Sequence, residues 1–416
     1  MTTTTTATTK PPIAIIGAGP CGLTLARLLE CKGIDYVVYE REQRNEPNRA
    51  GGSLDIHAAT GQRAIREAGL FEAFRKHARW EDEIFRAYGH DGVFRIALGD
   101  NGAGAGHTKR DAPEIDRGAL RSILLDSIPA EKIRWGRALA GVEMKGQQPG
   151  RRRPVLRFAD GTTEEGFALV VGADGVWSKV RPLLTDAKPQ YSGKTFIEAR
   201  IDRDNPIYET AAAKVGFGTM ACLGPSRQMV FQRQGDGAYR LYLAMVVPEA
   251  YTRDGSLDLS DTEGTRRALL ADALFRTWSE EWKVFVRHAE AFRSWPLYTM
   301  PAEAMAWTSV PGLAVVGDAA HVAVPAGEGV NCAMTDALEL ANKIAECGVG
   351  DLDRAVREYE EGMFPRAVKL INDGLVVGRA MFHDNNPDEF MRAVREGMLG
   401  STDDSADQDH GPDEKN

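Results

Sequence analysis

The sequence predicts an α/β protein in two domains, with a long C-terminal helix that bridges them. Three observations predict this fold. An apolar run at 13–16 leads into a glycine-rich turn and then a helical pattern. Two further apolar runs, at 168–172 and 313–316, each lead into a segment with glycine and aspartate, as expected for buried strands of a parallel sheet. Apolar and polar residues alternate at 240–245, which indicates a second sheet with one buried face.

The first element is a strand–turn–helix unit that begins at residue 13. The turn reads GAGPCG, so it has the spacing G-x-G-x-x-G. Gly17 suits the tight turn, Gly19 lets the backbone approach a pyrophosphate, and Gly22 allows the helix to pack closely on the strand. The N-terminus of that helix favours an anion. This unit predicts a Rossmann-like domain that binds a dinucleotide.

A second strand at 36–39 ends in Glu40, 18 residues after Gly22. A carboxylate at this position can accept hydrogen bonds from ribose hydroxyls. It would repel the 2′-phosphate of NADP, because both groups are anionic. We therefore expect FAD or NAD in this unit.

The segment 317–331, GDAAHVAVPAGEGVN, follows the apolar run at 313–316 and precedes a helical pattern at 333–344. Its glycines allow the backbone to approach a ligand, and the start of the helix offers free N–H groups to an electron-rich group. We therefore predict the second half of the cofactor site here. His321 is a candidate base, but we interpret it as a residue that makes local hydrogen bonds.

Composition excludes several classes of protein. The chain of 416 residues is 43% hydrophobic and 27% charged, with a net charge of −9, so we expect a globular protein with no nucleic-acid partner. No apolar run is long enough to span a bilayer, and the Thr-rich start lacks the apolar core of a secretory signal. The five cysteines show no metal-binding spacing. We expect a cytoplasmic protein, a monomer or homodimer, with no metal.

Three ordered motifs resemble those of the class A FAD-dependent monooxygenases, the para-hydroxybenzoate hydroxylase-like family. They are GAGPCG, the DG motif GADG at 172–175 and the GD motif at 317–318. Within that family the closest resemblance is to the tetracycline-inactivating monooxygenase subgroup. It rests on GGSLDIH (51–57), EIDRGALRSILL (114–125), GADGVWSKVR (172–181), GDAAH (317–321) and GEGVN (327–331).

The resemblance implies that FAD is the cofactor. Glu40 and Arg41 would lie at the adenosine ribose, Arg117 near the flavin and pyrophosphate, and Asp55 near the flavin ring. Asp318 would bind the ribityl chain or pyrophosphate, and Asp174 would act indirectly by orienting neighbouring groups. The full set of expected cofactor residues is Gly17, Gly19, Pro20, Gly22, Glu40, Arg41, Asp55, Arg117, Asp174, Asp318, Pro325, Gly327, Gly329, Val330 and Asn331.

The chain departs from the family at Glu328, where glutamine is common. A carboxylate beside the reduced, anionic flavin would be unfavourable unless it points away. The resemblance also implies a set of substrate residues: Glu198, Phe217, Met220, Phe231, Arg240 and Met381. Glu198 and Arg240 replace neutral groups of the tetracycline subgroup, so we expect a different substrate.

The motifs divide the chain into domains. We expect disordered tails at 1–11 and 400–416, the second of them acidic. The FAD-binding domain would be discontinuous, at 12–77, 110–184 and 296–350. A substrate domain, α+β with a sheet plus helices, would comprise 78–109 and 185–295, and a bridging helix would cover 351–385.

The resemblance implies a reaction as well. NADPH or NADH would reduce FAD, O₂ would form a flavin C4a-hydroperoxide, and one oxygen atom would pass to an aromatic, polycyclic or otherwise electron-rich small molecule. Secondary metabolism or xenobiotic modification would be the setting. Hydroxylation, epoxidation, Baeyer–Villiger-type and heteroatom oxidation all remain open. No protein catalytic residue is identified, because the flavin carries the chemistry. The alternatives are a flavin-dependent reductase or dehydrogenase on the same fold, and a non-catalytic flavin-binding protein.

Overall fold

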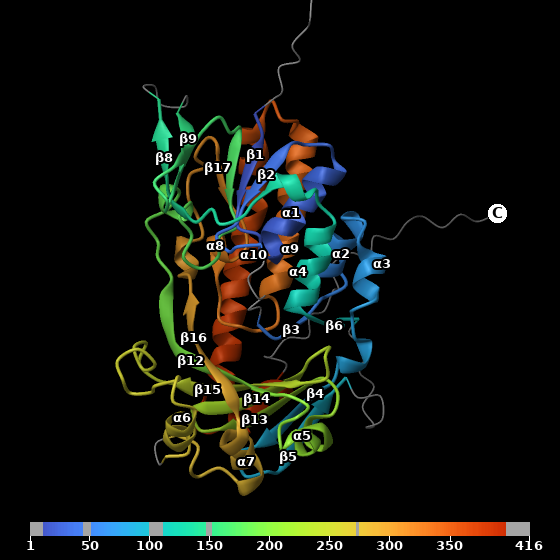
Figure 1. Ribbon diagram of the computed structural model, residues 1–416, viewed down its shortest axis with the longest axis vertical. Helices are drawn as coiled ribbons and strands as arrows, with labels where there is room; N and C mark the ends of the chain where they lie inside the picture. The colour runs from blue at the N-terminus through green and yellow to red at the C-terminus, as the bar shows by residue number, and fades with distance from the viewer. Residues whose placement is uncertain (1–10, 45–50, 100–110, 147–151, 272–273, 397–416) are drawn as a thin grey trace, which may run out of the picture.

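A five-stranded parallel sheet forms the centre of the upper part of the molecule in the computed structural model (Figure 1). The structure describes residues 11–44, 51–99, 111–146, 152–271 and 274–396; both predicted tails lie largely or wholly outside these ranges. The strand order is β17-β11-β1-β2-β7, and the strands are β1 (Ile13–Ile16), β2 (Tyr36–Tyr39), β7 (Ile133–Arg134), β11 (Leu169–Gly172) and β17 (Leu313–Val315). The predicted α/β fold is confirmed.

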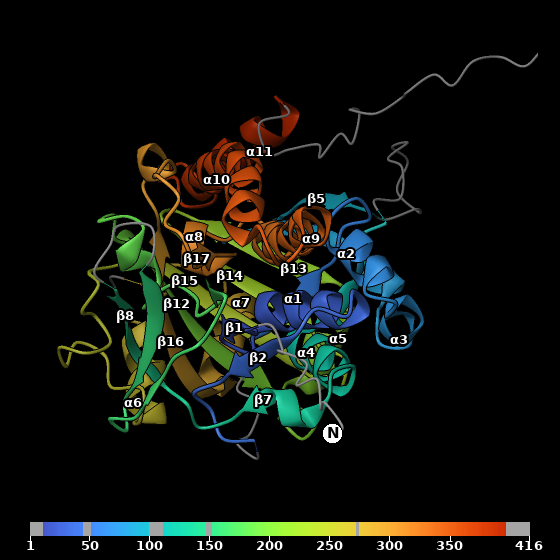
Figure 2. The same cartoon turned by 90° about the horizontal axis from the view of Figure 1, so that it is seen from above.

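Helices pack on this sheet and on one another. Helix α1 lies against α9, and α9 lies against α10 (Figures 1 and 2). Apolar residues of all three join the strands in one hydrophobic core. The helices of this part are α1 (Pro20–Cys31), α2 (Gly61–Glu67), α3 (Phe71–Arg75), α4 (Arg117–Asp126), α8 (Asp318–His321) and α9 (Gly329–Cys347), with 3₁₀ turns at Trp80–Asp82, Ala130–Lys132, Arg181–Leu183 and Ala302–Ala304.

A seven-stranded sheet forms the lower part, in the order β16-β12-β15-β14-β13-β4-β5 (Figure 1). A second hydrophobic core lies between one face of this sheet and its helices. The strands are β4 (Phe85–Gly89), β5 (Phe94–Leu98), β12 (Gln190–Ile201), β13 (Thr219–Gly224), β14 (Arg227–Arg233), β15 (Tyr239–Val246) and β16 (Glu290–Thr299), and the helices are α5 (Tyr208–Val215), α6 (Thr262–Leu269) and α7 (Glu280–His288). The alternation at 240–245 thus belongs to a strand, as predicted.

Two smaller sheets complete the described fold. One pairs β3 (Ser53–Asp55) with β6 (Glu114–Asp116), and the other comprises β8 (Leu139–Lys145), β9 (Arg153–Phe158) and β10 (Thr163–Glu164). The pairing of β3 with β6 is antiparallel and sets Asp55 opposite Glu114. It therefore brings together two segments that the sequence assigned to the cofactor site.

Helix α10 (Leu352–Met381) runs from the parallel sheet to the seven-stranded sheet (Figure 1). Its buried residues include Met363, Ala367, Leu370 and Ile371, so this face of the helix packs into the core. After the helix ends at Met381, α11 (Asp388–Arg395) packs against it. Among the described helices, none combines the length and apolar character needed to cross a membrane.

Candidate functional site

The glycine-rich turn lies at the carboxyl end of β1, between that strand and α1. Gly17 has a φ of +109°, and a Cβ there would clash with the Ala173 carbonyl. A Cβ on Gly22 would clash with the Gly17 carbonyl, whereas one on Gly19 would meet no atom within 4 Å. Pro20 is the first residue of α1. The backbone is therefore tightly packed on the protein side and open above Gly19, as a pyrophosphate requires.

Glu40 is buried at the end of β2 and accepts hydrogen bonds from the backbone N–H of Ala18 at 2.7 Å and of Glu42 at 2.9 Å. The carboxylate is thereby fixed beside the glycine-rich turn, while neighbouring Arg41 is exposed. On α4, the Arg121 Nε donates to the Ala18 carbonyl at 2.9 Å. Arg121 is not among the residues predicted from the sequence, although its position four residues after Arg117 places both on one side of a helix.

The other two motifs lie at the carboxyl ends of β11 and β17. Strand β11 pairs with β1, and β17 pairs with β11. Asp174 accepts from the Lys179 N–H at 2.7 Å, and burial raises its pKa. Arg181 donates to the Ala319 carbonyl at 2.9 Å and so ties the DG segment to the GD segment. Asp318 is exposed at the start of α8. The three motifs thus meet at one edge of the sheet.

The loop before α9 packs against β3 and the residues that follow it. The Asn331 side chain accepts from the His57 N–H and donates to the Asp55 carbonyl, both at 2.9 Å. The His57 ring lies between two carboxylates, with Nε2 at 2.9 Å from Asp55 and Nδ1 at 3.1 Å from Glu328. Glu328 therefore points toward His57. Neither His57 nor this pairing was predicted from the sequence.

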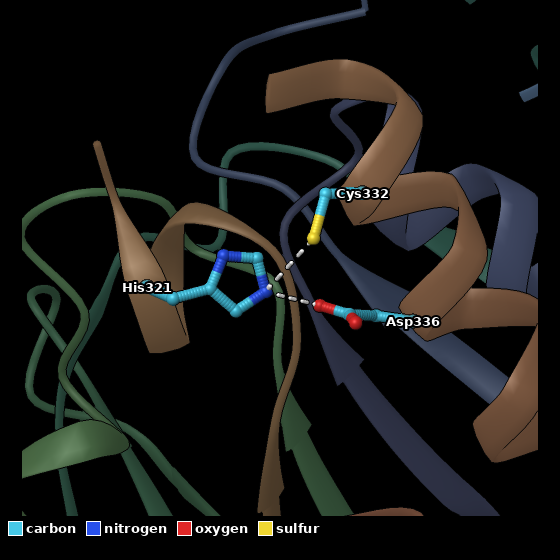
Figure 3. Close-up of side chains that lie close together, drawn as sticks. All are labelled: His321, Cys332 and Asp336. Atoms are coloured by element: carbon cyan, nitrogen blue, oxygen red, sulfur yellow. Dashed lines mark hydrogen bonds and ion pairs between the residues drawn. The ribbon is translucent and has the colours of Figure 1, made fainter. Parts of the chain in front are cut away.

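A fully buried polar cluster lies beneath this loop (Figure 3). The His321 Nε2 contacts the Asp336 carboxylate at 2.5 Å and the Cys332 thiol at 3.9 Å. Asp336 also accepts from the Gly317 N–H at 2.9 Å and from Arg366 at 2.8 Å. His321 and Arg366 hold the pKa of Asp336 below its usual value, although burial opposes them. His321 is thus a hydrogen-bonding residue, as interpreted, but its partner Asp336 lies on α9, 15 residues away, and not in the local segment.

This cluster brings together three atoms that could ligate a metal ion. However, one nitrogen, Nε2, faces both the thiol and the carboxylate (Figure 3). A Cys–His–Asp nucleophilic triad uses the two ring nitrogens separately, so this is not that arrangement. Asp336 is already paired with two cationic side chains and a backbone N–H. We interpret the cluster as a clamp between the GD segment, α9 and α10.

The face of the seven-stranded sheet opposite its helical core is polar at β12 and β15. Glu198 and Arg240 form an ion pair there, and the second Glu198 oxygen accepts from the Trp295 indole at 2.9 Å. The Tyr242 hydroxyl, on the same face, accepts from the Gly52 N–H at 3.0 Å. Burial raises the pKa of Tyr242 to about 12, so the hydroxyl stays protonated. This polar sheet face therefore meets the segment that leads into β3.

The remaining predicted substrate residues do not lie together. Met220 and Phe231 are fully buried in the helical core on the other side of the sheet, where Phe231 packs on the Phe285 ring. Side chains alternate between the two faces of a strand, so Met220 and Phe231 lie on the face opposite Glu198 and Arg240 and cannot line one site with them. Phe217 is 48% exposed at the surface, and Met381 packs beside α11.

Comparisons with known proteins agree with this geometry. A family model described as an FAD binding domain matches residues 10–372. Monooxygenase penA of Penicillium thymicola is 33% identical over 88% of this chain and 94% of its own length. The 3-amino-4-hydroxybenzoate 2-monooxygenase PtmB3 of Streptomyces platensis is 30% identical over 92% of this chain and 91% of its own. The tetracycline destructase Tet(51) has the same fold, with a TM-score of 0.67 at 19% identity over 94% and 96% of the two chains.

The chain belongs to this family of proteins with an FAD-binding domain, and it is an FAD-dependent monooxygenase. The residues present fit the cofactor: the turn is open above Gly19, and Glu40 stands buried beside it. The structural likeness to the tetracycline destructase extends to the fold alone.

Proposed function

We propose that this monooxygenase uses NADPH or NADH as a transient reductant and inserts one oxygen atom of O₂ into an aromatic, polycyclic or otherwise electron-rich small molecule. The observation that carries the proposal is the meeting of three motifs from 17–22, 172–175 and 317–318 at one edge of the parallel sheet. Ligands of such sheets bind at the carboxyl ends of the strands.

Each part of the site has a proposed role. The pyrophosphate of FAD lies over 17–22 and the N-terminus of α1, with Arg117 and Asp318 near it, and the adenosine ribose lies at Glu40 and Arg41. The flavin ring lies at Pro325, Gly327 and residues 329–331, next to Asp55. Bound FAD stores the electrons and activates O₂. Arg181, held near Asp174, keeps the DG and GD segments in register.

The substrate is proposed to lie on the polar sheet face, where Glu198, Arg240 and Tyr242 can orient it. The hydroxyl of Tyr242 remains a hydrogen-bond donor across the neutral pH range, because its pKa is raised to about 12. An aromatic substrate is supported by the name of the relative PtmB3, a hydroxylase of 3-amino-4-hydroxybenzoate. Phe217 and Met381 stay as further candidates.

The proposal is tested by mixing purified, FAD-loaded protein anaerobically with NADPH or NADH and a panel of aminohydroxybenzoates, polycyclic phenols and indoles. The expected result is bleaching of the flavin that a panel compound accelerates, followed by an ¹⁸O-labelled product when ¹⁸O₂ is admitted. Reduction of the flavin without ¹⁸O in any product would favour a flavin-dependent reductase or dehydrogenase. Yellow protein that neither nicotinamide reduces would favour a non-catalytic flavin-binding protein.

A further inference from the structure

Glu328 occupies the position directly before α9, where its carboxylate is close to the free N–H groups of the helix start. The first N–H groups of a helix have no partner within it, and an acidic side chain at this position is attracted to them. Yet Glu328 makes no capping hydrogen bond. Its Oε1 instead lies 3.1 Å from the Nδ1 of His57. The Glu328 side chain therefore leaves the first N–H groups of α9 without a capping bond, although this carboxylate is next to them in the chain.

His57 is held firmly in the position that draws Glu328 aside. Its backbone N–H donates to the Asn331 side chain, and its Nε2 lies 2.9 Å from Asp55 on β3. The titratable groups that face the ring are Asp55 from β3 and Glu328 from the loop, and Glu114 of β6 stands opposite Asp55 across the strand pair. Burial disfavours the charged ring, but the two carboxylates outweigh it and raise the pKa of His57 to about 9. The ring is a cation at neutral pH.

The pairing of His57 with Glu328 lies next to the proposed position of the flavin ring. Gly329, Val330 and Asn331 form the first turn of α9, and the proposed function sets the electron-rich edge of the flavin ring there. If Glu328 folded onto these N–H groups, it would occupy them and would set a second negative charge beside the reduced ring. Both effects weaken binding of reduced FAD.

We infer that His57 is a positioning residue that holds Glu328 away from the N-terminus of α9, so that the N–H groups of 329–331 remain available to the flavin ring. This inference rests on the proposed placement of the ring. It also gives the Glu328 carboxylate the cationic partner that a charged side chain near the flavin site needs.

The test is a double-variant cycle of His57→Leu, Glu328→Gln and the two combined, read out by the FAD dissociation constant and the midpoint potential. We expect His57→Leu to weaken FAD binding by roughly threefold to thirtyfold and to shift the potential to more negative values. Glu328→Gln alone should bind FAD about as well as the wild type. The combined variant should recover most of the loss, because the unpaired carboxylate has gone.

A combined variant as impaired as His57→Leu would overturn the inference, since His57 would then serve only to hold β3 against the loop. Equal FAD binding by all four proteins would overturn it too. If His57→Leu does not fold, the pH dependence of the wild type replaces it. FAD binding should weaken as the pH rises from 7 to 10 and His57 loses its proton, and Glu328→Gln should abolish that trend. If FAD binding weakens with rising pH in Glu328→Gln as it does in the wild type, the inference is wrong.

The same proteins separate this inference from the proposed function. If the wild type forms ¹⁸O-labelled product while all variants bind FAD equally, only the inference fails. If the variants follow the expected cycle but no labelled product forms with any substrate, the inference stands and the proposed reaction is wrong. Wild-type protein that binds no FAD would overturn both.

Discussion

The carboxylate of Glu198 on β12 and the guanidinium of Arg240 on β15 form an ion pair across neighbouring strands. Both side chains are nearly buried, and the Arg240 Nε has no hydrogen-bond partner. The pair lies on the polar sheet face. A buried charge pair of this kind gives little net stability but a large penalty when one partner is removed.

Replacement of Arg240 by methionine should lower the free energy of unfolding by roughly 3–5 kcal/mol, because Glu198 would keep a buried charge with no cation. Urea denaturation measures this loss. The matched control is the double variant Glu198→Leu/Arg240→Met, which should recover most of it. Equal losses in the single and double variants would show that the ion pair is not the cause.

Glu114 should make the stability of the protein depend on pH. Burial, aided by the charge of Asp55 opposite it, raises the pKa of Glu114 to about 8. The folded state therefore binds this proton more tightly than the unfolded state, so stability is lost as the pH rises from the unfolded pKa of about 4.3 through 8. Glu114→Gln should be more stable than the wild type at pH 9 by about 1–3 kcal/mol, with little difference at pH 4.

Thermal unfolding across this pH range checks that prediction, because the curves of the two proteins should separate between pH 5 and 8. Glu131→Gln, at the exposed turn before β7, is a suitable control and should follow the wild type. Parallel curves for Glu114→Gln and the wild type would contradict it.

Gly374 should be required for the close contact between α10 and the loop that leads into the proposed flavin site. A Cβ on Gly374 would lie 2.6 Å from the Val324 carbonyl oxygen, so Gly374→Ala must displace backbone one residue before Pro325. We expect a stability loss of about 1–3 kcal/mol and weaker FAD retention. Gly362→Ala on the same helix meets no atom within 4 Å and should gain up to about 1 kcal/mol.

Thermal unfolding together with flavin fluorescence compares these two variants directly. If Gly374→Ala and Gly362→Ala both lose FAD, the contact between Gly374 and Val324 is not the cause of weaker FAD retention.

Asp336 should be essential for the clamp at the GD segment. Its replacement by asparagine leaves Arg366 and the His321 ring without their carboxylate in a buried site, and we expect a loss of about 3–5 kcal/mol. Chemical denaturation is the measurement. Asp373→Asn, whose carboxylate pairs with exposed Lys369 on α10, is the control and should change stability by about 1 kcal/mol or less.

Treatment with a chelator should leave the thermal midpoint unchanged, and added zinc should not raise it. The reason is that Asp336 is already saturated by Gly317, His321 and Arg366, whereas a metal would need its lone pairs. Metal analysis of the purified protein is the direct check. A stoichiometric metal whose removal lowers the midpoint would make His321, Cys332 and Asp336 a structural metal centre instead.

Where the structure differs from the expectations, the differences share a cause. Residues 265–288 have a helical pattern, but the structure divides them between α6 and α7, with Phe275 and Trp278 buried in a turn between the two helices. Met220 and Phe231 lie on the core side of the sheet. An alternating pattern establishes that a strand has two faces, but not which of them the helices cover, because that depends on packing between distant segments.

The sequence by itself determined the parallel sheet, the glycine-rich turn, the order of the three motifs and the family that they define. These features are local, since a strand, its turn and the next helix are contiguous and obey short-range rules of backbone geometry. Only the tertiary structure decided that His57 meets Glu328, that Arg181 reaches Ala319, and that Asp336 joins His321 to Arg366. Such pairs join residues far apart in the chain, and the packing of whole helices and strands brings their charges together.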